Sequence, residues 1–290
     1  MYNAPLLQLR QVRDLGQNIA DTFVFLKYNW KPIYASIGLV GLPPLIIIGL
    51  ALKFGIGSMF EGLQSGRPDG GAIAGFFGVM LLLYVMMIVF FILCYAMVNE
   101  YVGAYVRNEH VGMTVGALLK RGLSSFWSYF GIGLLSGLMI IAGTVFCIIP
   151  GLYLWTNVVL APAAFAVERR GATEAISRSF QLTKNNWWES FGIGVLIVLI
   201  QYVIQQIVQL PLSLLLGVGI FAGFAPAAGD PEAAAHMMTT MFPLLMIIGI
   251  AGGMVTYPIS SVAAALRYFT LVEKREQVGL GEQVNTFEQL

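Results

Sequence analysis

Charged residues are scarce in this 290-residue chain: they make up 11% of the sequence, whereas 58% of the residues are hydrophobic. Soluble globular proteins carry about 25% charged residues, so there are too few charges here to cover a soluble surface. The net charge of +1 indicates neither a nucleic acid nor an acidic partner. The apolar residues fall in blocks of about 20, the length that crosses a bilayer as a helix. We therefore predict an all-α polytopic membrane protein.

Cysteine and histidine are also scarce, with two residues of each type. Cys94 and Cys147 each lie inside an apolar block without metal-ligand spacing, so we expect two buried thiols. The chain has no HExxH motif, no paired CxxC motif and no phosphate-binding loop ending in Lys-Ser/Thr. We predict no catalytic residue, no metal and no cofactor, and hence a protein that is not an enzyme. Residues 1–30 contain no apolar segment of the signal-peptide type.

Six apolar blocks are predicted to span the membrane, at residues 32–52, 72–98, 129–149, 152–167, 191–216 and 241–266. Pro43-Pro44 is expected to break or kink the first span, and Pro150-Gly151 to form the turn after the third. The expected organisation is an amphipathic N-terminal segment (1–30), a six-helix transmembrane domain (31–271) and a C-terminal tail (272–290).

Basic residues alternate across these spans. Fourteen of the 16 fall in the two terminal segments, in 99–128 and in 168–190; only Lys53 and Arg67 fall in the other loops. The positive-inside rule places the basic-rich set in the cytoplasm, together with both termini. Four of the five tryptophans agree with this orientation, because they lie at the expected cytoplasmic starts of the odd-numbered spans (Trp30, Trp127, Trp187 and Trp188).

A pattern of apolar residues precedes each odd-numbered span. Leu15, Ile19, Phe23, Leu26 and Trp30 have the spacing of one helix face. The same spacing recurs in two later sets: Val111, Val115, Leu119, Gly122, Phe126; and Ala172, Ile176, Phe180, Thr183, Trp187. We predict three copies of one unit, an amphipathic cytoplasmic helix followed by a transmembrane hairpin. Each amphipathic helix is expected to lay its apolar stripe on the acyl boundary, near anionic headgroups. Boundary composition common to membrane proteins is the alternative explanation.

Polar residues inside the fifth span form the first candidate site. Gln201, Gln205 and Gln209 are four residues apart and therefore share a helix face. With Asn157 of the fourth span they could line a polar groove for a solute or a lipid headgroup. The alternative is interhelical hydrogen bonding. The pairs Gly133/Gly137 and Gly249/Gly253 are interpreted as helix packing inside the bundle.

Acidic residues at the cytoplasmic boundary form the second candidate site. Glu100, Glu168 and Glu189 each lie at an edge of a span, with Arg169, Arg170 and Arg178 close in sequence to the last two. Interfacial ion pairs are the first interpretation. A ring of carboxylates around a cytoplasmic vestibule is the functional alternative.

The second half of the chain carries an ordered set of short motifs: Pro150-Gly151-Leu152-Tyr153-Leu154-Trp155, Ala161-Pro162-Ala163, Glu168, and Ala175-Ile176-Ser177-Arg178-Ser179-Phe180 continuing through Lys184. It resembles the bacterial family named after the glycerophosphoryl diester phosphodiesterase membrane domain. The resemblance implies a six-helix integral membrane protein and says little about activity. In some relatives this region is fused to a catalytic phosphodiesterase barrel, for which the spans and loops here leave no room.

The sequence thus favours a non-enzymatic protein of the bacterial inner membrane that organises or assists lipids or partner proteins. Anionic headgroups at the cytoplasmic face are the expected partners, and no nucleic acid is expected. The alternative is a transporter of a small amphiphile or lipid, suggested by the repeats, the proline pair and the glutamine face.

Overall fold

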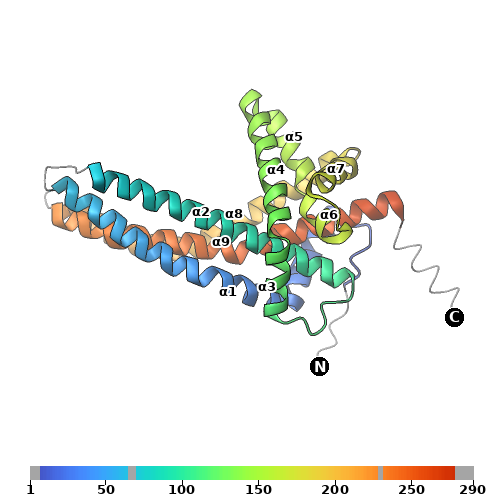
Figure 1. Cartoon of the computed structure of the whole chain (residues 1–290), viewed down its shortest axis with the longest axis horizontal. Coiled ribbons are helices and arrows are strands. Elements are labelled where there is room, and N and C mark those ends of the chain that lie inside the picture. Colours follow the sequence, from blue (N-terminus) through green and yellow to red (C-terminus); the bar gives the residue numbers. More distant parts are fainter. Residues whose placement is uncertain (1–6, 65–69, 228–230, 278–290) are drawn as a thin grey trace. The chain divides into compact units, whose positions relative to one another are not determined.

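The computed structural model describes residues 7–64, 70–227 and 231–277, and in these residues it is all-helical. The described residues form nine α-helices, which are labelled in Figure 1. In order, they are α1 (Leu15–Gln64), α2 (Gly70–Val106), α3 (Val115–Ser124), α4 (Phe126–Phe146), α5 (Ile148–Val158), α6 (Ala161–Glu168), α7 (Ala172–Thr183), α8 (Trp187–Ala227) and α9 (Pro231–Glu276). The all-α prediction is confirmed for this part of the chain.

Six helical segments are long and apolar enough to cross a bilayer, by length and composition. They are Leu15–Ala51, Phe77–Val106, Phe126–Phe146, Ile148–Glu168, Trp187–Leu210 and Ile247–Glu276. The predicted number of spans is therefore confirmed. The chain is a multi-pass membrane protein.

The chain divides into two compact units, and the predicted transmembrane domain, 31–271, contributes to both. The first unit contains residues 1–37, 92–201 and 257–290. In it, α7 packs on α4, α5 and α6. Its aromatic core includes Phe25, whose ring lies edge-on to those of Tyr101 and Tyr105, and Tyr129, which meets Phe165 in the same way.

The helices α4 and α5 form a tight hairpin that depends on two glycines. A Cβ atom at Gly143 would lie 3.1 Å from the backbone nitrogen of Gly151, and one at Gly151 would collide with Thr144. The missing side chains therefore let the two backbones approach closely. Cys147 makes the turn with an extended backbone. Pro150 falls inside the first turn of α5, where its missing N–H is tolerated, so the predicted turn at Pro150-Gly151 lies too late in the sequence.

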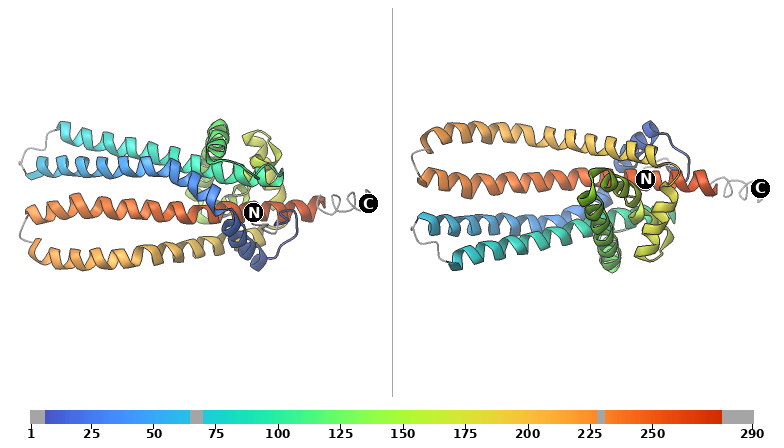
Figure 2. Two further views of the ribbon diagram at one scale, coloured as in Figure 1. Left: turned by 90° about the horizontal axis from the view of Figure 1, so that it is seen from below. Right: turned by 90° about the horizontal axis from the view of Figure 1, so that it is seen from above.

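The second unit contains residues 38–91 and 202–256. Its four segments belong to α1, α2, α8 and α9 and run side by side (Figure 2). Gly41 allows close packing there, because a Cβ atom at this position would meet the side chains of Met254 and Phe90. Ile48 and Leu83 are buried together, with Ile250 packed against them.

Of the break or kink predicted at Pro43-Pro44, the break is wrong, because α1 continues through both residues. Through this proline pair α1 keeps helical backbone angles, and its non-helical residue is Asn29 (φ −112°, ψ 18°). Proline is tolerated in transmembrane helices because neighbouring groups compensate for the lost backbone hydrogen bond. The break instead falls in the fourth span, where a turn at Val159 and Leu160 separates α5 from α6.

Three further expectations need correction. Cys94 is buried, but Cys147 is exposed at the tip of the hairpin. Gly133 has open space around it rather than a packed neighbour, and so does Gly137. In α9, Gly249 does pack near Gln209, whereas the second close contact is made by Gly252 rather than Gly253. Spacing alone does not tell which face of a helix meets protein.

Candidate functional site

Glu100 is the most deeply buried of the three predicted boundary carboxylates, with 0% of its side chain exposed. It lies near the end of α2 and forms a two-pronged ion pair with Arg169, with N–O distances of 2.8 and 2.5 Å. Tyr129 of α4 donates to the same carboxylate at 3.4 Å. Arg169 ends α6 with a left-handed backbone (φ 55°), which directs the chain into α7. The pair therefore ties α2 to the α6–α7 connection.

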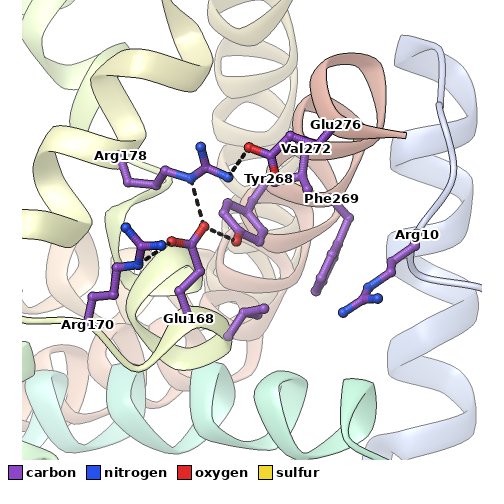
Figure 3. Close-up of a pocket in the computed structure, with 9 residues that line it drawn as sticks. Arg10, Glu168, Arg170, Arg178, Tyr268, Phe269, Val272 and Glu276 are labelled. Atoms are coloured by element: carbon purple, nitrogen blue, oxygen red, sulfur yellow. Dashed lines mark hydrogen bonds and ion pairs between the residues drawn. The ribbon is translucent and has the colours of Figure 1, made fainter. Parts of the chain in front are cut away.

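Glu168 is the centre of the second cluster, shown in Figure 3. Its Oε1 accepts hydrogen bonds from Arg178 Nε at 2.7 Å and from the Tyr268 hydroxyl at 2.8 Å. Arg170 forms an ion pair with its Oε2 at 3.2 Å. Arg178 also donates to Glu276 at 2.5 Å. The cluster thereby joins the end of α6, α7 and the C-terminal end of α9.

Arg178 of α7 is held on two sides in this cluster. Burial lowers the pKa of its guanidinium, but the hydrogen bonds with Glu276 and Glu168 outweigh this effect and raise the pKa overall. Arg178 therefore stays charged and acts as a fixed cation between two carboxylates.

A cavity of about 350 Å³ opens beside this cluster. It is lined by Arg10 of the N-terminal segment, by Glu168, Arg170 and Arg178, and by residues of α9 that include Tyr268, Phe269 and Glu276 (Figure 3). A second cavity, of about 490 Å³, lies between Tyr153 and the segment Lys184–Glu189. There the Trp187 ring stacks on those of Tyr153 and Phe191.

Glu189 lies in the first turn of α8 and forms the third cluster. It accepts from Arg267 at 3.0 Å and from Lys274 at 2.8 Å, and both of these partners belong to α9. Arg267 is only 2% exposed and also donates to the Ser190 hydroxyl. The cluster joins the start of α8 to the end of α9.

All three predicted boundary glutamates are thus in ion pairs; Glu168 pairs with Arg170 and Arg178 as their sequence positions suggested, whereas Glu100 and Glu189 pair with residues far away in the sequence. Arg169 pairs with Glu100 rather than with its neighbour Glu168, and Glu189 pairs across to α9. Each carboxylate faces its own arginine or lysine partner. The contacts in this part of the chain favour structural ion pairs over a ring of free carboxylates.

Two residues of the glutamine face contact α9. Gln205 donates to the Gly249 carbonyl of α9 at 3.0 Å, and the Gln209 amide lies near the Cβ position of Gly249. Gln201 is half-buried and belongs to the other unit. Asn157 donates to the Tyr153 carbonyl one turn earlier in α5, so its amide nitrogen bonds within its own helix.

Sequence reasoning missed two buried cations, Arg13 and Arg267. Arg13 donates to Asp21 at 2.8 Å and to the backbone carbonyls of Gln8 and Leu9, so it fastens the N-terminal segment to α1. Burial lowers the pKa of Arg13, and Asp21 partly offsets this effect. A signal for Arg267 was present in the sequence, because this arginine directly follows an apolar block and a charge in that place needs a partner.

The sequence profile of one family, a domain of unknown function (DUF7847), matches residues 93–271, more than half of the chain. The chain belongs to this family. No curated protein and no solved structure is significantly similar to the chain. The DUF7847 region contains Glu100, Glu168, Glu189 and most of their partners, and it leaves out α1. The resemblance to the glycerophosphoryl diester phosphodiesterase membrane-domain family stays a hypothesis beside this DUF7847 membership.

Proposed function

We propose that the chain is a non-enzymatic module of the bacterial inner membrane that binds the anionic cytoplasmic leaflet and so organises lipids or partner proteins. Four exposed lysines carry this proposal: Lys27, Lys31, Lys120 and Lys184. None of the four forms an ion pair within the described residues, whereas the arginines of the three clusters do. Lysines near the membrane surface attract anionic lipid, each by about 1 kcal/mol.

Exposed tryptophans accompany these lysines. Trp30, Trp127 and Trp188 are all exposed, and they lie just after the kink in α1 and at the starts of α4 and α8. Indole rings favour the headgroup region of a bilayer. Lysine and tryptophan together are typical of a surface that faces lipid headgroups. With the uneven distribution of basic residues, this favours cytoplasmic placement of both termini.

The proposed three-unit organisation is supported by the positions of the helix breaks. The chain leaves helical geometry at Asn29, at Ser125 and just before Trp187, at Asn186. These positions are equivalent in the repeat predicted from the sequence. The buried residues also correspond: one set is Thr22, Leu26, Ile33, the second is Leu118, Gly122, Tyr129, and the third is Ser179, Thr183, Ser190.

The apolar stripes of the three units differ in their surroundings. In α1, Leu15, Phe23 and Trp30 are exposed, as expected of residues that meet acyl chains, whereas Leu26 of the same stripe is buried. In α7, Ile176 and Thr183 are buried against protein, so this stripe does not lie on lipid. We therefore assign contact with the leaflet to the lysines and tryptophans and to the first stripe, not to α7.

Lipid selectivity of the full chain tests the proposal. The chain is reconstituted in bilayers of phosphatidylcholine with a trace of spin-labelled phosphatidylglycerol or spin-labelled phosphatidylcholine, and the motionally restricted fraction is measured. We expect preference for phosphatidylglycerol that falls as salt rises. The preference should also fall in a variant in which the four lysines are replaced by Gln. The matched control replaces Arg121, which is paired with Glu109. Equal restriction of both lipids by the wild type would refute the proposal.

Transport of a small amphiphile or lipid remains the second candidate, because the fourth span is discontinuous. The turn at Val159 and Leu160 interrupts it, and the buried Asn157 Oδ1 beside it makes no hydrogen bond within the described residues. Broken helices form the substrate sites of many transporters. The test is dithionite bleaching of fluorescent lipid in proteoliposomes: bleaching limited to the outer leaflet would reject lipid transport, and bleaching of both leaflets would support it.

A further inference from the structure

We propose that the cavity beside Arg10, Arg170 and Arg178 binds one phosphate group, either the phosphodiester of an anionic lipid headgroup or free inorganic phosphate. This inference rests on the proposed function, because it gives contact with anionic lipid a defined site. The cavity lies entirely within the first unit. Its volume of about 350 Å³ is at the lower end of the range for small-ligand pockets, which suits a headgroup rather than a whole lipid.

The charged residues that line the cavity are mainly cationic. Three arginines and two glutamates line the cavity, which leaves a net charge of +1. Both carboxylates already accept hydrogen bonds from other residues of the cavity lining. Glu168 accepts from Arg178 and Tyr268, and Glu276 accepts from Arg178.

Arg178 and Arg170 differ in the number of their ion-pair partners and in the exposure of their side chains. Arg178 is fixed by two carboxylates and only 16% exposed. Arg170 is 62% exposed and meets Glu168 at the longer distance of 3.2 Å. Guanidinium groups bind phosphate oxygens through two parallel N–H donors. Arg170 is therefore the cation most able to turn toward a ligand, while Arg178 keeps the wall in place.

The wall on the side of α9 is partly apolar. Phe269 and Val272 line the same cavity as the arginines (Figure 3). An apolar surface next to a cationic one suits an ester whose phosphate lies against Arg170 and whose glycerol carbons lie against Phe269. Inorganic phosphate would use only the cationic part. The site can thus distinguish a lipid headgroup from a free ion.

The test measures the unfolding temperature of the full chain in an uncharged detergent. The probes are dihexanoyl phosphatidylglycerol, dihexanoyl phosphatidylcholine and inorganic phosphate. We expect phosphatidylglycerol to raise the unfolding temperature of the wild type, and Arg170→Gln to weaken the apparent affinity about tenfold, as loss of a charge-assisted hydrogen bond would. Arg121→Gln, a control on α3, should behave like the wild type.

Each outcome decides the proposal. An equal response to inorganic phosphate supports the anion site and identifies free phosphate as its ligand; a response to phosphatidylglycerol alone identifies the headgroup. The site is rejected if phosphatidylcholine acts as well as phosphatidylglycerol, or if Arg170→Gln and Arg10→Gln both respond like the wild type. If both arginine variants respond like the wild type here, while the wild type still selects phosphatidylglycerol in the spin-label assay, the cavity is rejected and the proposed function is kept.

Discussion

The ion pair between Glu100 and Arg169 should contribute to stability in an asymmetric way. The carboxylate is 0% exposed, whereas the guanidinium is 42% exposed. If Arg169 is replaced by Gln, Glu100 remains buried without a cation, and its nearest other donor is Tyr129 at 3.4 Å. If Glu100 is replaced by Gln, Arg169 can be hydrated from its exposed side. The two single substitutions should therefore differ, although each removes the same pair.

The magnitudes follow from these exposures. Breaking a buried pair so that one charge stays uncompensated costs about 3–5 kcal/mol, which we expect for Arg169→Gln. Loss of hydrogen bonds to a charged group that can be rehydrated costs about 1.5–3 kcal/mol, which we expect for Glu100→Gln. The double variant should cost less than the sum of the two, because it leaves no buried charge.

Chemical unfolding of the purified chain in mixed micelles provides the assay, with tryptophan fluorescence as the signal. Arg170→Gln is the control, since this exposed neighbour should cost less than about 1 kcal/mol. Glutamine at position 169 meets nearly the same left-handed backbone requirement as arginine, so the comparison isolates the charge. If Glu100→Gln destabilises the chain as much as Arg169→Gln, or if Arg170→Gln matches Arg169→Gln, the reasoning from exposure is wrong.

Three other changes have defined outcomes. Gln205→Leu should destabilise the chain by about 1 kcal/mol through loss of its bond to α9, whereas the exposed Gln206→Leu should not; unfolding in micelles compares them. Burial lowers the pKa of His110, which stacks on Tyr105, so stability should fall as the pH drops below about 6.5, where the unfolded chain takes up the proton first. His110→Phe should lose this dependence in pH-scanned unfolding. Gly103→Leu should prevent folding, because a Cβ atom there would lie 2.6 Å from the Ala166 carbonyl oxygen. The size-exclusion profile of the purified variant measures this.

The helical class and the number of spans could be predicted because hydropathy over about 20 residues reports directly on the bilayer. Hydropathy averaged over such a window does not reveal a short break in the helix inside one apolar segment. The turn at Val159 and Leu160 joins two apolar helices without any change in hydropathy, so the fourth span was expected to be continuous. Conversely, Pro43-Pro44 signals a break in water, but transmembrane helices tolerate proline.

The buried face of the first helix could have been found in the sequence. Asn18, Thr22 and Asn29 are buried, while Leu15 and Phe23 are exposed. This is the reverse of a soluble amphipathic helix, which exposes its polar face and buries its apolar one. Asn18 and Thr22 are four residues apart, and Asn29 follows Thr22 by seven residues, so the three share one face of the helix. This buried polar face lies next to the apolar stripe on which the sequence prediction relied.

Spacing in the sequence could not predict the ion pairs between residues far apart in the chain. Glu100 and Arg169 are 69 residues apart, and Arg178 and Glu276 are 98 apart. Adjacent charges such as Glu168 and Arg169 favoured a local assignment. The left-handed backbone at Arg169 turns its side chain toward α2 instead, and this depends on how α6 packs on its neighbours.

The proposed contact with anionic lipid of the inner leaflet requires that the four exposed lysines lie on the cytoplasmic side of the membrane. Lys184 tests this directly, because it is exposed and lies just before α8. In a chain with Cys94→Ala and Cys147→Ser, the single substitution Lys184→Cys is treated with a membrane-impermeant maleimide in intact spheroplasts and in inverted membrane vesicles. We predict labelling in the inverted vesicles only. Labelling in intact spheroplasts would place this surface on the outer side and contradict the proposed function.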